Sequence, residues 1–456
     1  MICKGPLTPA QLASSQHNYH IFSLINGLSY MCLGETVLIL LAVRLGCPDY
    51  IVSTLGAMIY FGFLLLPLGK VVTARAGAAK SQSIFWVARN AAALLVALAA
   101  VVSISGMPRT ATALLLAGAF FFYGFRAAGV VMSQPLVGNI TNEKDRAKVI
   151  GVNAGFFYLS CLAALVTISI LLKLCDSLAM LTGIVVAGAL LGFTASRFIN
   201  RICETEAIRD SARKPIAGEF RLLFHDKSLL RLLASGFAVN LAVIMLIPIS
   251  MLALKRGCGV SDTEALLFAL AQFGASAGAS FLSGRISNTI GPRRTLLYSY
   301  LLLLGAGVLW VIAPSGFSPV YLTLPFLIAG ATNVGTANSV THYFLQTVPE
   351  EKRVAASMFI AVVNGAGAGI VGMLLAGMLL DRCTGIEADS PLTGYRLYFA
   401  LSVLLLSAGI WVISRLTPLP PERRKIRKSW NDEGNDGTVK FFGLLHQAQG
   451  LAVALR

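Results

Sequence analysis

The segment SIFWVARNAAALLVALAAVVSIS, residues 83–105, decides the fold class of this chain. Arg89 is its only charged residue, and as a helix the segment is long enough to cross a hydrocarbon core about 30 Å thick. Outward from it, similar apolar segments lie at 21–44, 51–69, 111–134, 149–173, 179–198, 229–254, 264–283, 295–313, 320–345, 354–380 and 396–415. We therefore predict an all-α membrane protein with twelve transmembrane helices.

The composition also indicates a membrane protein. Of the 456 residues, 56% are hydrophobic and 13% are charged, whereas soluble domains carry about 25% charged residues. A soluble fold of this length cannot bury so much apolar surface, but a bilayer can solvate it. The formal net charge of +16 does not indicate a nucleic-acid partner, because the Lys and Arg residues punctuate apolar stretches instead of gathering with aromatic residues on one polar surface.

The distribution of basic residues predicts the orientation in the membrane. The side that holds the N-terminus carries 28 of the 37 Lys and Arg residues, the other side carries seven, and two lie within spans. By the positive-inside rule both termini are cytoplasmic, and an even number of spans gives the same answer. The first apolar run, from Ile21, lacks a signal-peptide cleavage pattern. We expect a monomeric multi-pass protein of a bacterial cytoplasmic (inner) membrane.

The chain divides near its midpoint into two related halves. We predict six-helix bundles at 21–198 and 229–416, a polar cytoplasmic linker at 199–228, and cytoplasmic segments at 1–20 and 417–456. Three pairs of segments repeat at near-equal offsets: LAVRLGC (41–47) with LALKRGC (252–258), Gly69-Lys70 with Gly284-Arg285, and NEKDRA (142–147) with PEEKRV (349–354). Such repeats are a recurring construction of membrane carriers, so we expect the two bundles to be pseudo-symmetric.

A loop at the end of the second predicted span of each half supplies a family resemblance. GRISNTIGPRR (284–294) resembles the loop motif G-x-L-x-D-x-x-G-R-K of the major facilitator superfamily, and GKVVTARAG (69–77) is a degenerate first copy. The resemblance covers about residues 20–416 and implies a conformational gating loop formed by Gly69, Lys70, Gly284, Arg285, Gly291, Arg293 and Arg294. Asn288 and Thr73 stand where the family usually has an acid, so a charge-based latch of the usual kind is not expected.

Glu35 and Arg126 are the charged residues expected deepest in the bilayer. At 1.5 Å per residue both lie near mid-depth, about 20 to 22 Å from the inner face, where a charge costs at least about 2.5 to 3.5 kcal/mol. In the fold that the resemblance implies, their spans both line the central cavity. We predict that Glu35 is the proton- or cation-coupling carboxylate and that Arg126 is its counter-charge or an anchor for a substrate anion. The alternatives are a structural ion pair, or a hydrated Glu35 near the outer interface.

Other intramembrane polar residues are candidates for binding the solute. Arg89 lies about eight residues inside its span, so we expect it to snorkel toward the headgroups, with substrate binding as the alternative. Amides suit hydroxylated or amide-bearing solutes, and helix-to-helix hydrogen bonding is the equally ordinary alternative. The uncharged candidates are Asn26, Tyr158, Asn240, Gln272, Asn333, Asn338 and Asn364, while His342 is expected to be solvated near the cytoplasmic surface.

The sequence lacks the common signatures of soluble enzymes. It contains no G-x-x-x-x-G-K-[ST] phosphate loop, no H-E-x-x-H and no G-x-S-x-G, so we expect no enzymatic activity and no cofactor. The eight cysteines are scattered without C-x-x-C pairs, so we expect no metal site.

The resemblance implies a secondary active transporter that moves a small organic solute by alternating access, coupled to H⁺. Two alternatives stay open: a non-transporting membrane receptor or assembly partner with the carrier fold, and a proton-driven exporter of drugs or metabolites. The fifth span lacks the Pro-Gly-Gly ending that marks many drug–proton antiporters, which lowers the export alternative without excluding it.

Overall fold

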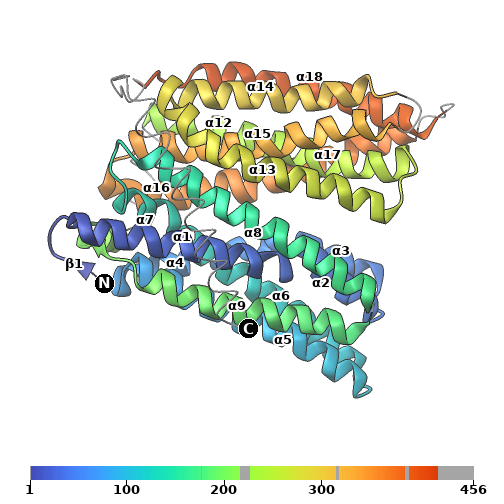
Figure 1. Ribbon diagram of the computed structural model, residues 1–456, viewed down its shortest axis with the longest axis horizontal. Coiled ribbons are helices and arrows are strands. Elements are labelled where there is room, and N and C mark those ends of the chain that lie inside the picture. The colour runs from blue at the N-terminus through green and yellow to red at the C-terminus, as the bar shows by residue number, and fades with distance from the viewer. Residues whose placement is uncertain (1, 176, 216–225, 315–317, 386–389, 420–456) are drawn as a thin grey trace, which may run out of the picture.

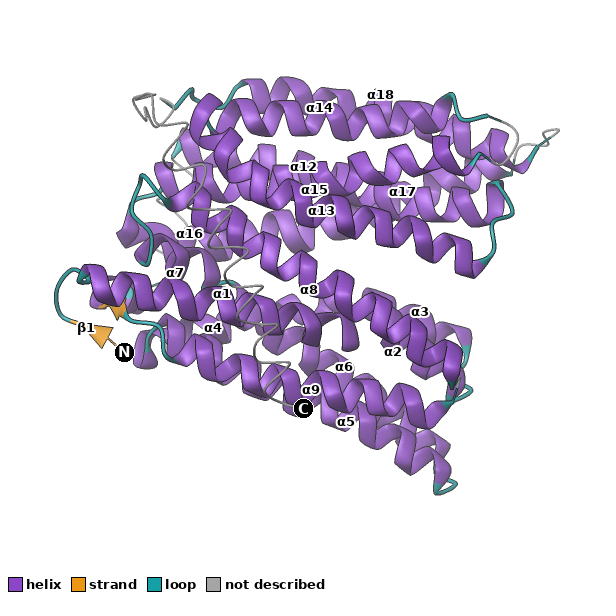
Figure 2. Cartoon of the chain, viewed as in Figure 1, coloured by secondary structure: helices purple, strands orange, loops and turns teal. Residues whose placement is uncertain are grey.

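Helices account for nearly all of the structure, a computed structural model that describes residues 2–175, 177–215, 226–314, 318–385 and 390–419. Within these ranges, 12 helices are long and apolar enough to cross a membrane, which confirms the predicted fold class. Figure 1 shows the first six spans, coloured blue to green, below the last six, and Figure 2 shows how little of the chain is not helical. Most of the predicted tail, from 420 onward, lies outside the described residues.

The first six spans are built from continuous helices and from shorter helical pieces. Their bounds are α1 Pro9–Cys32 with α2 Glu35–Arg44; α3 Asp49–Phe61, the 3-10 turn η1 Gly62–Leu65 and α4 Leu66–Ala76; α5 Ala78–Ile104; α6 Pro108–Val130 with α7 Ser133–Asn139; α8 Arg146–Leu174; and α9 Leu178–Asn200. Inside this half, α5 packs against α6 and α9, and α1 packs against α8 and α9.

The last six spans repeat this plan. Their bounds are α12 Lys227–Leu252 with the π-helical turn η2 Ala253–Gly257; α13 Asp262–Ile290; α14 Pro292–Val311; α15 Pro319–Thr347; η3 Glu350–Lys352, α16 Arg353–Ile360, the π-helical η4 Ala361–Gly367 and α17 Ala368–Thr384; and α18 Pro391–Ser414. Between the halves lie the strand β2, Glu204–Thr205, and the helix α10, Glu206–Arg213. Contacts between the halves include α8 packed along α13.

The first span differs from the single segment 21–44 that the sequence predicted. Its helix begins at Pro9, because Thr8 and Gln11 form a capping box that satisfies N–H groups of the first turn. The helix ends at Cys32, and α2 begins at Glu35 after the cap residue Gly34. Glu35 is therefore the first residue of a new helix inside the span.

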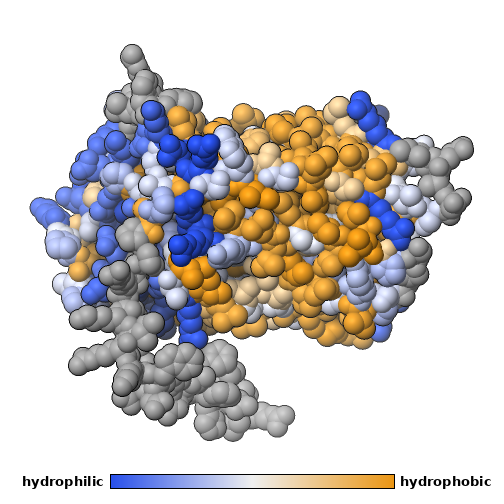
Figure 3. All heavy atoms as spheres, turned by 90° about the horizontal axis from the view of Figure 1, so that it is seen from above, coloured by the Kyte–Doolittle hydropathy of each residue, from blue (hydrophilic) through white to orange (hydrophobic). Residues whose placement is uncertain are grey.

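Polar residues gather at one end of the molecule. Figure 3 shows a strongly hydrophilic end beside a broad apolar band that suits a bilayer. We call it the basic end; it includes Arg75, Arg146, Arg201 and Arg293, which lie at the ends of helices or in the turns between them, and Lys70 within α4. Two glycines start helices there in the left-handed conformation, Gly77 before α5 (φ 86°) and Gly291 before α14 (φ 87°). Side chains other than hydrogen disfavour this conformation, so both halves contain the same glycine-dependent turn.

The segment between the halves holds the beginning of α5 in place. The strand β1, Ile2–Cys3, pairs in parallel with β2, which lies next to the start of α5. There the buried carboxylate of Glu204 accepts hydrogen bonds from the N–H groups of Ala78 (2.8 Å) and Ala79 (3.2 Å), which have no partner within the helix. Burial raises the pKa of Glu204 above its ordinary value, although the two N–H groups oppose the rise.

Glu204→Ala is expected to destabilise the protein by about 2 kcal/mol, because two buried N–H groups lose their acceptor. Glu204→Gln keeps an acceptor and removes the titration. Because the folded-state pKa is raised, Glu204 contributes most at low pH, and its contribution is lost as pH rises through the folded-state pKa. The melting temperature of the wild type relative to that of Glu204→Gln, measured in detergent, should therefore fall as pH rises above the ordinary pKa of a glutamate. A difference that stays constant or rises with pH would contradict the assignment.

Candidate substrate cavity

A cavity of about 320 Å³ lies between the two halves. Most of its lining comes from α1, α5, α7 and α8 of the first half, and α15 closes it from the second half. The lining residues are Tyr19, Phe22, Ser23, Asn26, Gln82, Trp86, Val130, Ser133, Gln134, Val137, Ile150, Asn153, Ala154, Phe157, Tyr158, Val334, Ala337, Asn338 and Thr341. None of these side chains carries a charge, so the lining combines aromatic and aliphatic surface with amides and hydroxyls.

Three amides in the lining have an atom with no hydrogen-bond partner among the described residues. They are Oε1 of Gln82, Oε1 of Gln134 and Nδ2 of Asn153. Gln82 is 1% exposed and Asn153 is 7% exposed, so neither is solvated as a surface amide would be. A buried polar atom without a partner costs about 1 to 3 kcal/mol, and these atoms therefore favour a bound molecule that carries both donors and acceptors.

Two of these amides, Gln82 and Asn153, are held at their opposite ends by protein groups. Gln82 Nε2 donates to Ser133 Oγ (3.0 Å). Asn153 Oδ1 accepts from Ser23 Oγ (3.2 Å) and lies 2.8 Å from His20 Nδ1. These bonds fix each side chain, so its second polar atom stays available to a ligand.

Arg89 lies buried behind the cavity and does not reach the headgroups. Its guanidinium donates to Asn26 Oδ1 (3.4 Å), Ser29 Oγ (3.1 Å) and Asn90 Oδ1 (3.2 Å), and it lies 4.9 Å from the ring centroid of Trp86. The expectation of snorkelling was wrong, because helix packing brings neutral oxygen acceptors and an aromatic face to the cation inside the bundle. Arg89 instead positions Asn26, which lines the cavity.

Arg126 lies against the first span. Its guanidinium lies 5.0 Å from the ring centroid of Tyr30 on α1. The side chain of Glu35 lies outside the described residues, so the predicted pairing of Glu35 with Arg126 stays a prediction.

The predicted uncharged candidates separate into two groups. Asn26, Tyr158 and Asn338 line the cavity; Asn338 Nδ2 also donates to Ser283 Oγ (2.8 Å). Asn240, Gln272, Asn333 and Asn364 are not among the lining residues. Asn240 bonds to the carbonyl of Gly236 on its own helix (2.8 Å), and Asn364 lies in the π-helical η4 against Gly236.

The two halves are joined between the cavity and the basic end. Arg146 of α8 donates to the carbonyl of Leu345 near the end of α15 (3.0 Å), and Arg353 of α16 donates to the same oxygen (3.3 Å). Ser357 Oγ also donates to the carbonyl of Val131 (3.0 Å). Cations stabilise the free carbonyls at a helix C-terminus. Arg146 and Arg353 occupy equivalent positions of the repeated segments 142–147 and 349–354. Equivalent residues of the two halves therefore bind the same carbonyl group.

Comparison with known proteins identifies the family to which this architecture belongs. The model of the Major Facilitator Superfamily matches residues 20–372. The chain belongs to this superfamily. No curated protein sequence matches it.

Solved structures of other superfamily members have the same fold. A bacterial homologue of the iron transporter ferroportin, in an outward-facing state, is 13% identical, with a TM-score of 0.68 over 88% of this chain and 98% of that one. The human organic anion transporter MFSD10 (TETRAN) is 14% identical, with a TM-score of 0.68 over 89% and 100%. FucP in its outward conformation is 12% identical, with a TM-score of 0.64 over 90% and 99%. At these identities the likeness shows the fold alone.

The residues of the superfamily's loop motif lie where helices approach most closely at the basic end. Gly69 of α4 packs against the carbonyl of Ala128, and Gly284 of α13 packs against the carbonyl of Ala147. Cations of the motif bond to neighbouring segments: Lys70 donates to the carbonyl of Lys214 (2.6 Å) and Arg293 donates to the carbonyl of Ser414. No described contact assigns a gating role to Arg285 or Arg294, so their roles stay predictions.

Sequence reasoning missed several of the residues that line the central cavity. Gln82 and Trp86 lie one helical turn apart on α5, and Asn153 and Phe157 are spaced in the same way on α8, so the signal was a helical face that carries an amide and an aromatic residue. His342 was also wrongly expected to be solvated. It is 1% exposed, because Nδ1 lies 2.7 Å from Ser287 Oγ and Nε2 lies 3.0 Å from Gln346 Nε2.

Proposed function

We propose that this member of the superfamily is a secondary active transporter that moves a small, uncharged polar solute by alternating access. The observation that carries the proposal is the cavity between the halves, in which three amides present polar atoms without partners among the described residues. Two bundles around a central site are the construction on which alternating access operates. The structural similarity to transporters supports transport over enzymatic catalysis or a receptor function.

The cavity favours an uncharged solute over an anion. Its lining contains acceptors at Gln82 and Gln134 and a donor at Asn153, but no described basic side chain. Arg89 lies close by, yet its hydrogen bonds go to oxygens of the protein. A volume of about 320 Å³ is at the lower end of the range of about 300 to 1,000 Å³ typical of ligand sites. We infer a small solute that carries hydroxyl or amide groups beside an apolar face.

We further propose that transport is coupled to H⁺ through Glu35, with Arg126 as its counter-charge, and that the basic end faces the bacterial cytoplasm. The excess of Lys and Arg on that side supports the orientation. The position of Glu35 at a helix break, and the contact of Arg126 with the same span at Tyr30, support the coupling site.

Asn153→Leu is expected to weaken solute binding about tenfold, because the protein loses one polar contact to a buried ligand. A library of sugars, amino acids, nucleosides, carboxylates and drugs is first screened for thermal stabilisation of the purified protein. The hits are then measured for affinity, and for flux in proteoliposomes. Asn240→Leu is the matched control, since it makes the same change at a half-buried amide outside the cavity.

The outcomes separate the proposed function from its alternatives. Binding and flux of a neutral polar solute, weakened by Asn153→Leu and unchanged by Asn240→Leu, would support it. Binding without flux would favour a receptor or assembly partner. Stabilisation by drugs alone, followed by their extrusion, would favour an exporter. A carboxylate as the only ligand would contradict the uncharged class.

A further inference from the structure

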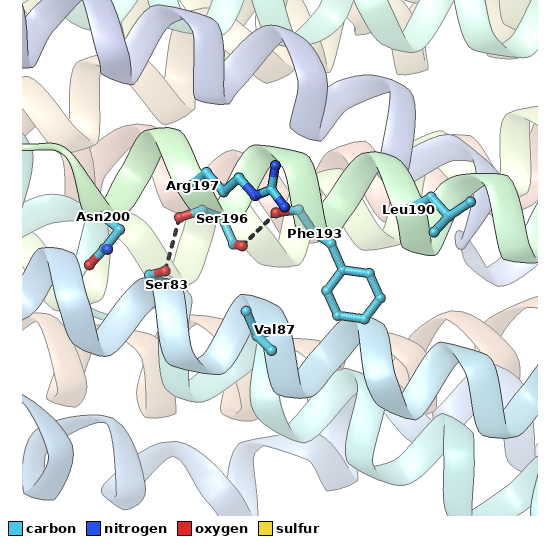
Figure 4. A pocket seen from close by; sticks show the side chains of 7 residues that line it. All are labelled: Ser83, Val87, Leu190, Phe193, Ser196, Arg197 and Asn200. Atoms are coloured by element: carbon cyan, nitrogen blue, oxygen red, sulfur yellow. Dashed lines mark hydrogen bonds between the residues drawn. The ribbon is translucent and has the colours of Figure 1, made fainter.

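A second hollow lies on the outer surface of the first half, away from the central cavity. It is a crevice of about 580 Å³ between α5 and α9, near the basic end. Figure 4 shows its seven lining residues on these two neighbouring helices: Ser83, Val87, Leu190, Phe193, Ser196, Arg197 and Asn200. Leu190 is 58% exposed and Val87 is 44% exposed. In a membrane-spanning helix, such exposed aliphatic side chains face lipid, so the crevice opens to the bilayer.

Tight contacts between α5 and α9 form the floor of the crevice. Ser83 Oγ donates to the carbonyl of Ser196 (2.9 Å), as Figure 4 shows. Further along, Gly192 of α9 lies directly against the side chain of Asn90 on α5. Because these contacts hold the two helices together along the crevice, its shape is preformed and does not depend on a ligand.

The chemistry of the lining changes along the crevice. Arg197 and Asn200 lie in the last turn of α9, and Ser83 lies in the second turn of α5, so these polar groups mark the membrane surface at the basic end. Val87, Phe193 and Leu190 lie progressively deeper, over a stretch of about 10 to 15 Å at 1.5 Å per residue. A polar, cationic head and an apolar body in this order match the amphipathic structure of a phospholipid.

Arg197 is the charged group of the crevice and is available to a ligand. Its side chain is exposed, and among the described residues neither Arg197 nor Asn200 makes a side-chain hydrogen bond or ion pair. Unneutralised cations at the headgroup level attract anionic lipids.

We propose that this crevice is a binding site for one anionic phospholipid. The lipid phosphate is held by Arg197 and Asn200, and one acyl chain lies along Val87, Phe193 and Leu190. The site goes beyond the proposed transport function, since its occupant stays in the membrane and bridges α5 to α9 on the outside of the bundle.

Arg197→Gln is expected to weaken the binding of phosphatidylglycerol about fivefold. Phosphatidylglycerol is added to the full chain in neutral detergent, and binding is followed by native mass spectrometry and by the melting temperature. Arg201→Gln is the matched control. It removes the same charge four residues later, where the guanidinium lies 5.6 Å from the ring centroid of Phe198 and outside the crevice. Phosphatidylcholine tests the need for a net negative charge, and inorganic phosphate tests the need for an acyl chain.

A second pair of variants tests the apolar part of the crevice. Val87→Trp fills the crevice from its exposed wall and should reduce phosphatidylglycerol binding at least as much as Arg197→Gln, while Val101→Trp, at another exposed position of α5, should not. The proposal is overturned if Arg201→Gln and Arg197→Gln have equal effects, if phosphatidylcholine binds as tightly as phosphatidylglycerol, or if inorganic phosphate stabilises the protein equally well. It is also overturned if Val87→Trp leaves binding unchanged.

Discussion

Gly284→Leu is expected to reduce transport more than tenfold while leaving the protein folded in the membrane. Gly284 lies where α13 of the second half crosses α8 of the first, and a Cβ there would meet the carbonyl of Ala147 and, at 3.1 Å, the Cα of Lys148. Backbone atoms cannot rotate away as a long side chain can, so the two helices must separate. Overpacking of this kind costs about 1 to 3 kcal/mol, and about 1.4 kcal/mol changes an equilibrium tenfold.

The affected equilibrium is the one on which alternating access depends. In this structure the halves meet at the basic end through Gly284, Arg146 and Ser357. A leucine at 284 penalises only conformations in which these ends touch, so the population shifts toward conformations in which they are apart. Spin-label distances between the basic ends of α8 and α13 should increase, and flux should fall.

Gly278→Leu is the matched control for this prediction. Gly278 lies on the same helix, but a Cβ there meets no atom within 4 Å. Its transport should stay close to that of the wild type. Equal loss in both variants would show that leucine in α13 is harmful in itself, and full activity of Gly284→Leu would show that this contact is not part of the transport cycle.

Glu35→Gln is expected to abolish proton-driven accumulation while leaving exchange of the solute across the membrane intact. Glutamine has the shape and neutrality of a protonated carboxyl group, so the carrier can change conformation but cannot release a proton. A pH gradient of one unit is worth about 1.4 kcal/mol, or about tenfold accumulation for one coupled H⁺. In proteoliposomes with such a gradient the accumulation ratio should fall from about ten to about one, with counterflow retained.

Glu264→Gln is the control for the coupling prediction. Glu264 is a carboxylate near the end opposite the basic end, and it forms a capping box at the start of α13, where Ser261 bonds to it. These hydrogen bonds lower its pKa, so it stays ionised and has no proton to exchange near neutral pH. Coupling should survive in Glu264→Gln. Unchanged accumulation in Glu35→Gln would remove Glu35 from the coupling mechanism.

Arg89 and Asn153 show that the sequence did not predict contacts between helices that are distant along the chain. Arg89 could be placed at a depth in its span, but its partners Asn26 and Ser29 come from α1, some sixty residues away in the chain. Asn153 stands in a stretch, 149–172, that has no charged residue to mark it, and only the approach of α1 and α15 makes it part of a cavity. The repeated loop could be recognised from the sequence, because helices that approach closely at Gly69 and Gly284 leave no room for a side chain there.

The sequence by itself determined that this chain crosses the membrane twelve times and that the basic residues gather at one end. Both follow from local energies, since each span must be long and apolar enough for the hydrocarbon core, and most cations lie outside the spans, where water solvates them. Only the tertiary structure decided which amides face the cavity, that Arg89 is buried among neutral oxygens, and that the first span breaks before Glu35. Hydrogen bonds and close packing between helices that are distant in the sequence decide these features. The hydropathy of a single helix does not predict which other helices pack against it.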